Sequence, residues 1–175
     1  MKVLIVRAHP EPKSLNGSLF RVAIDELQAQ GHELQVSDLY AFKWKPQIDR
    51  VDFPHLSSED RLIVVAASAK GYESGALTDD VKAEQAKLVW ADAVVLLFPL
   101  WWFSMPAILK GWFERVYSAG HAYGIGAKRY GEGIFEGKRA MLAADARSFS
   151  NDANCLSPSG CWGLWNTLDD TKGGC

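Results

Sequence analysis

The sequence predicts an α/β fold in which helices cover both faces of a parallel sheet, a doubly wound sandwich. Two continuous apolar runs, residues 3–6 and 93–98, have the pattern of strands that are buried on both faces. Residues 3–39 give the order strand, helix, strand, which is a βαβ unit with a right-handed crossover. Apolar residues at helical spacing in residues 15–27 and 106–116 supply stripes that can pack on such a sheet.

The composition is that of one ordinary globular domain. The chain has 175 residues, 48% of them hydrophobic and 23% charged, and a net charge of −2. It has no basic run, and no apolar run near the ~20 residues of a membrane-spanning helix, so we expect neither nucleic-acid binding nor membrane insertion. The three cysteines all lie at or beyond residue 155 without a CxxC pair. We therefore expect no disulfide framework, no metal site and a cytoplasmic protein.

The first half of the chain contains the predicted βαβ unit and a long irregular segment. Residues 15–27 are expected to be a helix that stops at Gly31, and residues 33–39 alternate as a second strand. Residues 41–58 have no clean period and are expected to form a long surface connection. Residues 61–67 fit either a strand or part of a helix, and their pattern leaves this open.

A helix is expected over residues 78–90, with Thr78 and Asp79 as candidates for its N-cap. Gln85 is the polar member of a face that is otherwise apolar. The apolar members of this face are Val81, Leu88 and Val89.

The strand at residues 93–98 leads to another helix, for which Ser104 is the expected N-cap and Pro106 an early, tolerated position. The apolar stripe of this helix consists of Ile108, Leu109, Trp112, Phe113 and Val116. A glycine-rich aromatic loop at residues 120–133 precedes a fourth strand at residues 138–144.

The chain changes character at Asp145, where a doubly wound domain should supply a further helix and strand. Residues 145–175 contain only two short tryptophan-bearing apolar islands and no helical pattern of useful length. We therefore divide the chain into a domain at residues 1–144 and a divergent tail at residues 145–175, and expect the sheet to lack its last strand and helix.

The loop after the first strand, residues 9–16, is a candidate anion site. It has neither the GxGxxG nor the GxxxxGK[ST] pattern, but it leads into a helix N-terminus, whose free N–H groups favour an anion. Ser14 and Asn16 can donate hydrogen bonds, and His9 could add a partial charge. The alternative is that Ser14 only caps the helix and His9 only packs.

Three consecutive aromatic residues, Trp101, Trp102 and Phe103, follow the strand at residues 93–98. Ligands of doubly wound proteins bind at the carboxyl ends of strands, so a flat, electron-rich ligand such as a flavin would suit this wall. The alternatives are a hydrophobic cluster and a dimer surface, where tryptophan and phenylalanine are also enriched.

The remaining polar residues give no catalytic set. Tyr123 and Tyr130 lie in the glycine-rich loop, and each could be a surface residue or a ligand contact. His32 and His55 are most simply solvated, and His121 has no acidic partner placed by sequence. Because no Ser/His/Asp or Cys/His arrangement can be assembled, a cofactor is expected to carry the chemistry.

These residues resemble the NAD(P)H:quinone oxidoreductase family, flavodoxin-like enzymes that include DT-diaphorase and its bacterial relatives. The resemblance covers residues 2–142, about four-fifths of the chain, and is densest in the segment FPLWWFSMPAILKGWFERV at residues 98–116. Further matching segments are residues 3–6, 8–10, 14–16, 37–40, 83–85, 87–88, 91–92 and 122–124.

The resemblance implies a flavoprotein that binds FAD, or FMN in some members, and transfers a hydride from NAD(P)H through the flavin to a quinone or another small electrophilic acceptor. It also implies a homodimer with active sites at the subunit interface. The residues implied at the flavin phosphate and ribityl chain are His9, Leu15 and Asn16. Those implied around the isoalloxazine are Leu100, Trp101, Trp102 and Phe103, and those implied in the shared nicotinamide and quinone pocket are Trp102, Phe103 and Tyr123.

The chain departs from the family after the fourth strand. The family has a Thr-Thr-Gly-Gly type loop that wraps the flavin, followed by a tyrosine and a histidine, whereas this chain has Asp145-Ala146-Arg147-Ser148. The departure leaves an alternative open, a flavin-binding or ancillary protein, such as a subunit of a potassium-efflux system, with little catalysis. It also predicts a bare sheet edge at residues 138–144.

Overall fold

A computed structural model describes residues 1–124 and 133–145 of the chain. Its sheet has four parallel strands in the order β2-β1-β3-β4. Val3 in the first strand lies opposite Leu34 on one side and Ala93 on the other. The strands are β1 (Lys2–Arg7), β2 (Glu33–Asp38), β3 (Ala93–Pro99) and β4 (Arg139–Asp145).

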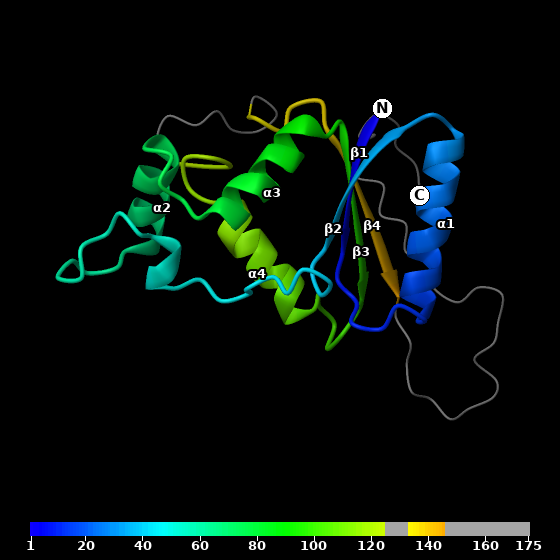
Figure 1. Ribbon diagram of the computed structural model, residues 1–175, viewed down its shortest axis with the longest axis horizontal. Coiled ribbons are helices and arrows are strands. Elements are labelled where there is room, and N and C mark those ends of the chain that lie inside the picture. The colour runs from blue at the N-terminus through cyan, green and yellow to red at the C-terminus, as the bar shows by residue number, and fades with distance from the viewer. Residues whose placement is uncertain (125–132, 146–175) are drawn as a thin grey trace, which may run out of the picture.

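The helices cover both faces of this sheet, as the sequence predicts (Figure 1). One helix, α1, lies on one face, and α3 and α4 lie on the other, with α2 outside them. A right-handed βαβ path requires the chain to alternate in this way between strands and covering helices. The helices are α1 (Leu15–Ala29), α2 (Val64–Glu73), α3 (Asp79–Trp90), α4 (Ala107–Val116) and the short 3-10 helix η1 (Arg50–Asp52).

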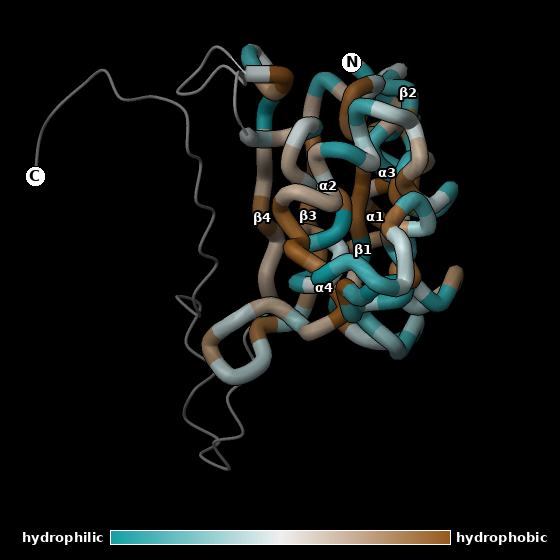
Figure 2. Tube along the Cα trace, turned by 90° about the vertical axis from the view of Figure 1, so that its left-hand side faces the viewer, coloured by the Kyte–Doolittle hydropathy of each residue, from teal (hydrophilic) through white to brown (hydrophobic). Residues whose placement is uncertain are grey.

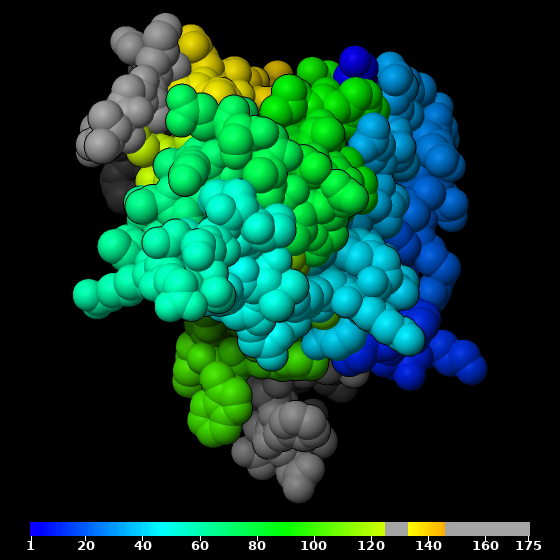
Figure 3. Space-filling view, turned by 60° about the vertical axis from the view of Figure 1, so that its left-hand side comes forward, coloured from blue at the N-terminus to red at the C-terminus, as the bar shows by residue number. Residues whose placement is uncertain are grey.

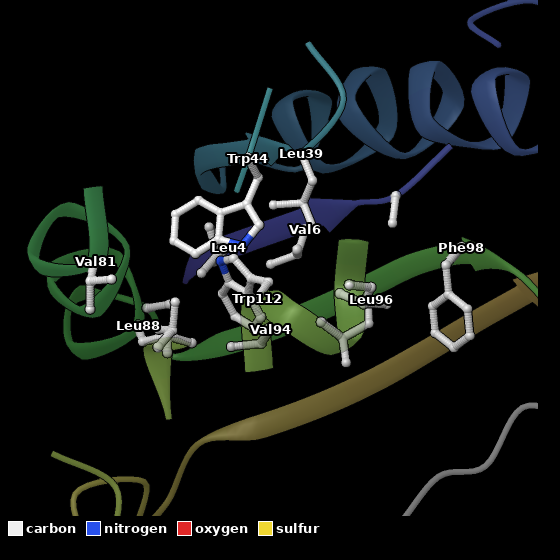
Figure 4. Packing of buried hydrophobic residues seen from close by; sticks show 14 of the residues in the cluster. Leu4, Val6, Leu39, Trp44, Val81, Leu88, Val94, Leu96, Phe98 and Trp112 are labelled. Atoms are coloured by element: carbon white, nitrogen blue, oxygen red, sulfur yellow. The ribbon is translucent and has the colours of Figure 1, made fainter. Parts of the chain in front are cut away.

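The main hydrophobic core lies between the sheet and the helices α3 and α4 (Figure 4). Trp112 of α4 is fully buried there, and its indole N–H donates to the Glu84 carboxylate at 2.8 Å. This bond satisfies the one polar atom of the ring, as burial of tryptophan requires. Core residues labelled around it include Leu4, Val6, Trp44, Leu88, Val94 and Leu96.

A smaller core under α1 leaves part of the opposite face open. Val3, Ile5 and Ala93 pack there against the helix. Next to them a groove of about 380 Å³ runs between α1 and the strands β3 and β4. Met141 and Leu142 of β4 are 42% and 40% exposed, and Figure 2 shows apolar colouring along this strand.

The strand β4 pairs with β3 from Arg139 to Asp145 and, within the described residues, forms the edge of the sheet. This agrees with the expected edge at residues 138–144. The expected loss of a fifth strand and helix concerns residues 146–175, which lie outside the described part of the chain.

Three expectations about the helices need correction or completion. Residues 61–67 contain the start of a helix, because α2 begins at Val64. Val89 is 58% exposed, so its place on the buried face of α3 was wrong. Gln85 is buried instead, because its side-chain amide donates to the Val116 carbonyl and to the Ser118 hydroxyl, each at 3.0 Å.

The expected N-cap of the next helix was also wrong. The helix α4 begins at Ala107, with Pro106 at the N-cap position. Ser104 lies in a tight turn before it, where its backbone pairs with Trp101. The carbonyl of Pro106 accepts hydrogen bonds from the N–H groups of Leu109 and Lys110 at 2.9 and 3.1 Å, and the helix begins there without a capping side chain.

The long connection at residues 41–58 is confirmed as irregular, apart from the short helix η1. In the part of the chain that the structure describes, none of the helices has the length and apolar character needed to cross a lipid bilayer.

Candidate functional site

Two loops that are distant in sequence meet at the carboxyl edge of the sheet. The His9 loop (residues 8–14) follows β1, and the aromatic loop (residues 100–104) follows β3; both lie at the lower end of the molecule in Figure 1. The rings of His9 and Trp101 lie 6.2 Å apart, centroid to centroid. Because β1 and β3 are neighbours whose chains leave in opposite directions, the crevice between their loops is where such folds bind ligands.

Ser14 organises the end of the His9 loop. Its hydroxyl oxygen accepts a hydrogen bond from the Gly17 N–H at 3.0 Å and donates to the Glu11 carbonyl at 2.7 Å. Ser14 is therefore the N-cap of α1, and its hydroxyl hydrogen is used inside the loop. Helix geometry leaves the N–H groups of Leu15 and Asn16 pointing outward at the positive end of the helix dipole.

The His9 side chain is fixed by the same loop. Its Nδ1 accepts a hydrogen bond from the Glu11 N–H at 3.0 Å. The Glu11 carbonyl and the Ser14 hydroxyl also lie near Nδ1, at 3.1 and 3.2 Å. The Glu11 N–H can only donate, so its contact favours the tautomer of the neutral ring that carries the proton on Nε2. His9 thus presents a hydrogen-bond donor on the side of the ring away from the loop backbone.

Asn16 is the strongest sign of a polar ligand at this helix end. Its side chain is completely buried, and neither amide atom has a hydrogen-bond partner within the described residues. Leaving such an amide unsatisfied costs about 1–3 kcal/mol, so a partner from outside the described residues is expected. Beside it, a Cβ on Gly17 would lie 2.0 Å from the Pro12 carbonyl oxygen, which shows how closely the loop backbone rests on α1.

The aromatic loop is a strained two-residue turn. Trp101 and Ser104 donate backbone hydrogen bonds to each other at 2.9 and 3.0 Å. Between them, Trp102 and Phe103 have φ angles of +51° and +59°. Two successive left-handed residues define a type I′ turn, which usually contains Asn-Gly, and bulky side chains there are strained. Strain of this kind clusters at ligand-binding sites.

The turn carries its rings into solvent. Trp102 is 94% exposed and Phe103 is 93% exposed. Figure 3 shows the chain around residue 100 as a green lobe that projects from the lower edge of the molecule. The described residues therefore form no hydrophobic cluster around these two rings, whereas a flat ligand or a second subunit can cover them. Behind the turn, the Leu100 N–H donates to the Asp145 carbonyl at 2.8 Å and ties the loop to β4.

Tyr123 lies in a different place from the aromatic loop. Its ring is 48% exposed, and its carbonyl accepts a hydrogen bond from the Gly120 N–H at 2.7 Å. It lines a surface pocket of about 460 Å³ over α4, to which neither Trp102 nor Phe103 contributes. Its neighbours in that pocket are Ile48, Val64, Lys110, Phe113, Glu114 and Tyr117. Tyr130 lies outside the described residues.

Two histidines outside the loops are buried more deeply than their sequence contexts suggest. The expectation that His55 is solvated was wrong, because both of its ring nitrogens are buried and the ring packs edge-on against Phe53. His121 is 3% exposed, and burial lowers its pKa to about 4. It contacts the rings of Tyr72 and Phe135, and neither ring nitrogen has a partner among the described residues. His121 is thus neutral near pH 7, and it lies apart from the two loops.

Sequence reasoning missed Arg7, the last residue of β1. Its guanidinium is buried and contacts the His9 loop through the Glu11 carbonyl. A signal was present, because a charge at the end of a strand that is buried on both faces needs a specific partner. No group of three or more potential metal ligands occurs within residues 1–124 and 133–145.

The strand order, the helices on both faces and the crevice between the loops after β1 and β3 define a flavodoxin-like protein. A family model described as a flavodoxin-like fold matches residues 1–153, and the chain belongs to this family. The resemblance to the NAD(P)H:quinone oxidoreductases is confirmed by individual relatives.

A ribosyldihydronicotinamide dehydrogenase-like protein of Penicillium crustosum is 58% identical over 149 residues, covering 81% of this chain and 56% of that protein. The ribosyldihydronicotinamide dehydrogenase [quinone] of Mus musculus is 46% identical over 143 residues, covering 81% and 62%. A solved structure from Klebsiella pneumoniae, assigned as a quinone reductase, is 50% identical with a TM-score of 0.79, covering 83% and 59%. The chain thus spans 56–62% of the length of these relatives.

Proposed function

We propose that residues 1–144 form the flavin-binding domain of an NAD(P)H-dependent quinone reductase, and that residues 145–175 are a separate tail. The observation that carries this proposal is the meeting of the His9 loop and the aromatic loop, with the rings of His9 and Trp101 6.2 Å apart. One loop offers donors for an anion, and the other offers a flat apolar wall. A flavin nucleotide has both a phosphate and a broad aromatic ring system, so it matches the pair.

The His9 loop would hold the phosphate end of the cofactor. The outward N–H groups of Leu15 and Asn16 and the Nε2–H of His9 are donors suited to a phosphate. The buried Asn16 amide would find its missing partner on the ribityl chain or the phosphate. Ser14 contributes by fixing the turn, since its hydroxyl already bonds within the loop.

The aromatic loop would hold the isoalloxazine through Leu100, Trp101, Trp102 and Phe103. FAD is the proposed cofactor, with FMN as the variant that the same loops could accept. A bound flavin supplies a two-electron carrier that takes a hydride from NAD(P)H and delivers it to a quinone or similar electrophilic acceptor. The exposed rings of Trp102 and Phe103 would exclude water and orient both substrates over this cofactor.

Tyr123 is proposed as a further substrate contact, supplied by a second copy of the chain. Trp102 and Phe103 of the same subunit do not line its pocket over α4. A homodimer would therefore be needed to bring these three residues together. A cytoplasmic location fits this chemistry. The names of the relatives favour the reductase over an ancillary role with little catalysis.

The first test is the visible absorption spectrum of the purified chain with FAD, FMN and riboflavin in turn. We expect a yellow complex with FAD or FMN that NAD(P)H bleaches and that a quinone restores. Riboflavin lacks the phosphate, so its dissociation constant should be at least about tenfold higher than that of FMN if the His9 loop binds an anion. A chain that stays colourless with all three compounds would contradict the proposal.

A further inference from the structure

Arg7 is held on three sides at the end of β1. One Nη donates to the Asp38 carboxylate of β2 at 2.5 Å, and the other donates to the Glu11 carbonyl at 3.2 Å. The plane of the guanidinium lies near the ring of Phe20, 5.3 Å from its centroid. With 4% of its surface exposed, Arg7 has little freedom to leave this position.

The Glu11 carbonyl that Arg7 contacts is the central acceptor of the His9 loop. It also accepts a hydrogen bond from the Ser14 hydroxyl at 2.7 Å and one from the Ser14 N–H at 3.3 Å. The N–H of Glu11 in turn donates to His9 Nδ1 at 3.0 Å. The orientation of Glu11 therefore sets both the helix cap and the ring nitrogen that His9 presents outward.

We propose that Arg7 is a positioning residue for the phosphate of the flavin, acting through the Glu11 carbonyl; this rests on the flavin-binding function proposed above. A carbonyl oxygen turned toward the crevice would repel a phosphate. The buried Arg7 binds this oxygen and fixes its direction, so that the donors of Leu15, Asn16 and His9 stay directed at the anion. Since Asp38 neutralises the guanidinium, Arg7 acts by geometry more than by net charge.

The forked shape of arginine is essential to this role. Two separate Nη atoms reach Asp38 and Glu11 at the same time. A lysine ammonium can keep the ion pair with Asp38, but it is a single point charge on a flexible stem and cannot reproduce the planar fork. The variant Arg7→Lys therefore removes the link to the loop while it preserves the charge.

The test measures dissociation constants of FMN and riboflavin for the wild type, Arg7→Lys and Asp38→Asn. We expect Arg7→Lys to weaken FMN binding about tenfold and riboflavin binding less than about twofold. Asp38→Asn, which keeps the link to Glu11, should weaken FMN binding less than about threefold. Arg50→Lys is the matched control, because Arg50 also donates to two backbone carbonyls, those of Ser57 and Asp60, in another loop.

Equal losses for FMN and riboflavin in Arg7→Lys, or an equal FMN loss in Asp38→Asn, would overturn the role of Arg7. A second readout needs no flavin: ¹⁵N NMR of the His9 ring should show the Nε2–H tautomer in the wild type and a tautomer mixture in Arg7→Lys. An unchanged His9 signature in Arg7→Lys would also overturn the inference. If the wild type binds neither flavin, the proposed function fails, and the His9 signature still decides the role of Arg7.

Discussion

At the scale of single residues, the turn at Trp102 and Phe103 has a strained backbone that lowers stability, while its side chains are suited to bind a ligand. Both residues have left-handed backbone angles that asparagine and glycine adopt more readily. The double variant Trp102→Asn/Phe103→Gly should raise the free energy of unfolding by about 1 kcal/mol and abolish the proposed flavin-dependent quinone reduction. Urea denaturation and steady-state assays measure the two effects.

The control for this variant is Phe42→Gly. Phe42 is a half-exposed aromatic residue in a loop, but its φ is not in the left-handed region. Its replacement by glycine should lower the free energy of unfolding and leave quinone reduction in place. A loss of stability in the turn variant as well would show that the turn is not strained.

His121 gives the fold a pH dependence of known sign. Burial lowers its pKa from 6.5 to about 4. Between pH 6.5 and pH 4 the unfolded chain binds a proton at His121 that the folded chain does not bind. The free energy of unfolding is therefore highest above pH 6.5 and falls as the pH drops toward 4. The free energy of unfolding should be lower by about 2 kcal/mol at pH 5. This pH lies above the pKa values of ordinary carboxyl groups.

The variant His121→Phe should remove this slope, because phenylalanine fits the aromatic contacts with Tyr72 and Phe135 and has no proton to bind. Urea midpoints at pH 7.5 and pH 5 measure the difference. If the pH dependence persists in His121→Phe, it comes from other titratable groups.

At the scale of elements, a buried ion pair attaches the irregular connection at residues 41–58 to α4. Two nitrogens of Arg115 donate to one oxygen of Asp52 at 3.0 and 2.7 Å, and a third donates to the Lys45 carbonyl at 3.0 Å. Asp52→Ala removes the buried carboxylate and leaves Arg115 paired with the partly exposed Asp80 carboxylate at 2.7 Å, so it should lower the free energy of unfolding by about 2 kcal/mol. Proteolysis in native buffer should then cut within residues 41–58.

The exposed pair between Lys110 and Glu114 on the same helix is the matched control. Glu114→Gln should change the free energy of unfolding by no more than about 0.5 kcal/mol, since both groups are well solvated. Equal effects of Asp52→Ala and Glu114→Gln would show that the buried pair of Arg115 contributes no more to the free energy of unfolding than an exposed pair does.

The strands at residues 3–6 and 93–98 were predictable because helices cover both faces of the sheet, so side chains on both faces of these strands are apolar. Residues 3–6 and 93–98 are apolar without alternation, as strands covered on two faces must be. The start of α2 was not predictable in this way. Ile63, Val64 and Val65 are β-branched and at least 36% exposed, so local pattern favoured a strand while tertiary packing selected a helix.

Those parts of the site that depend on residues next to one another in the sequence were predictable. The cap at Ser14 and the aromatic residues after β3 could both be read from the sequence. The type I′ turn could not, because tryptophan and phenylalanine have no preference for left-handed angles. The contact between Arg7 and Glu11 depends on the path of a loop, which single-sequence patterns do not specify.

At the scale of the whole molecule, Tyr123 and the aromatic loop lie in separate surface regions of one chain. If the active site joins them across a homodimer, Trp102→Ala and Tyr123→Ala remove opposite halves of each site. Each variant alone should be nearly inactive. Mixing equal amounts after dissociation should restore about a quarter of wild-type activity, because half of the dimers then contain one intact site.

The control for the mixing experiment is the double variant Trp102→Ala/Tyr123→Ala mixed with either single variant, which should restore no activity. Sedimentation of the wild type measures whether the dimer forms. No recovery in a mixture that demonstrably contains mixed dimers would place Tyr123 outside the shared site.

The side chains that fix the His9 loop are translated long before the strand that completes their surroundings. The groups that hold the Glu11 carbonyl come from Arg7 and Ser14, and the partner of Arg7 is Asp38. All of them precede β3, the strand that pairs with β1 along Val3 to Arg7. Because a domain folds as a unit, a nascent chain that ends before β3 should leave the His9 loop open to proteolysis, although it already contains every side chain that fixes the loop.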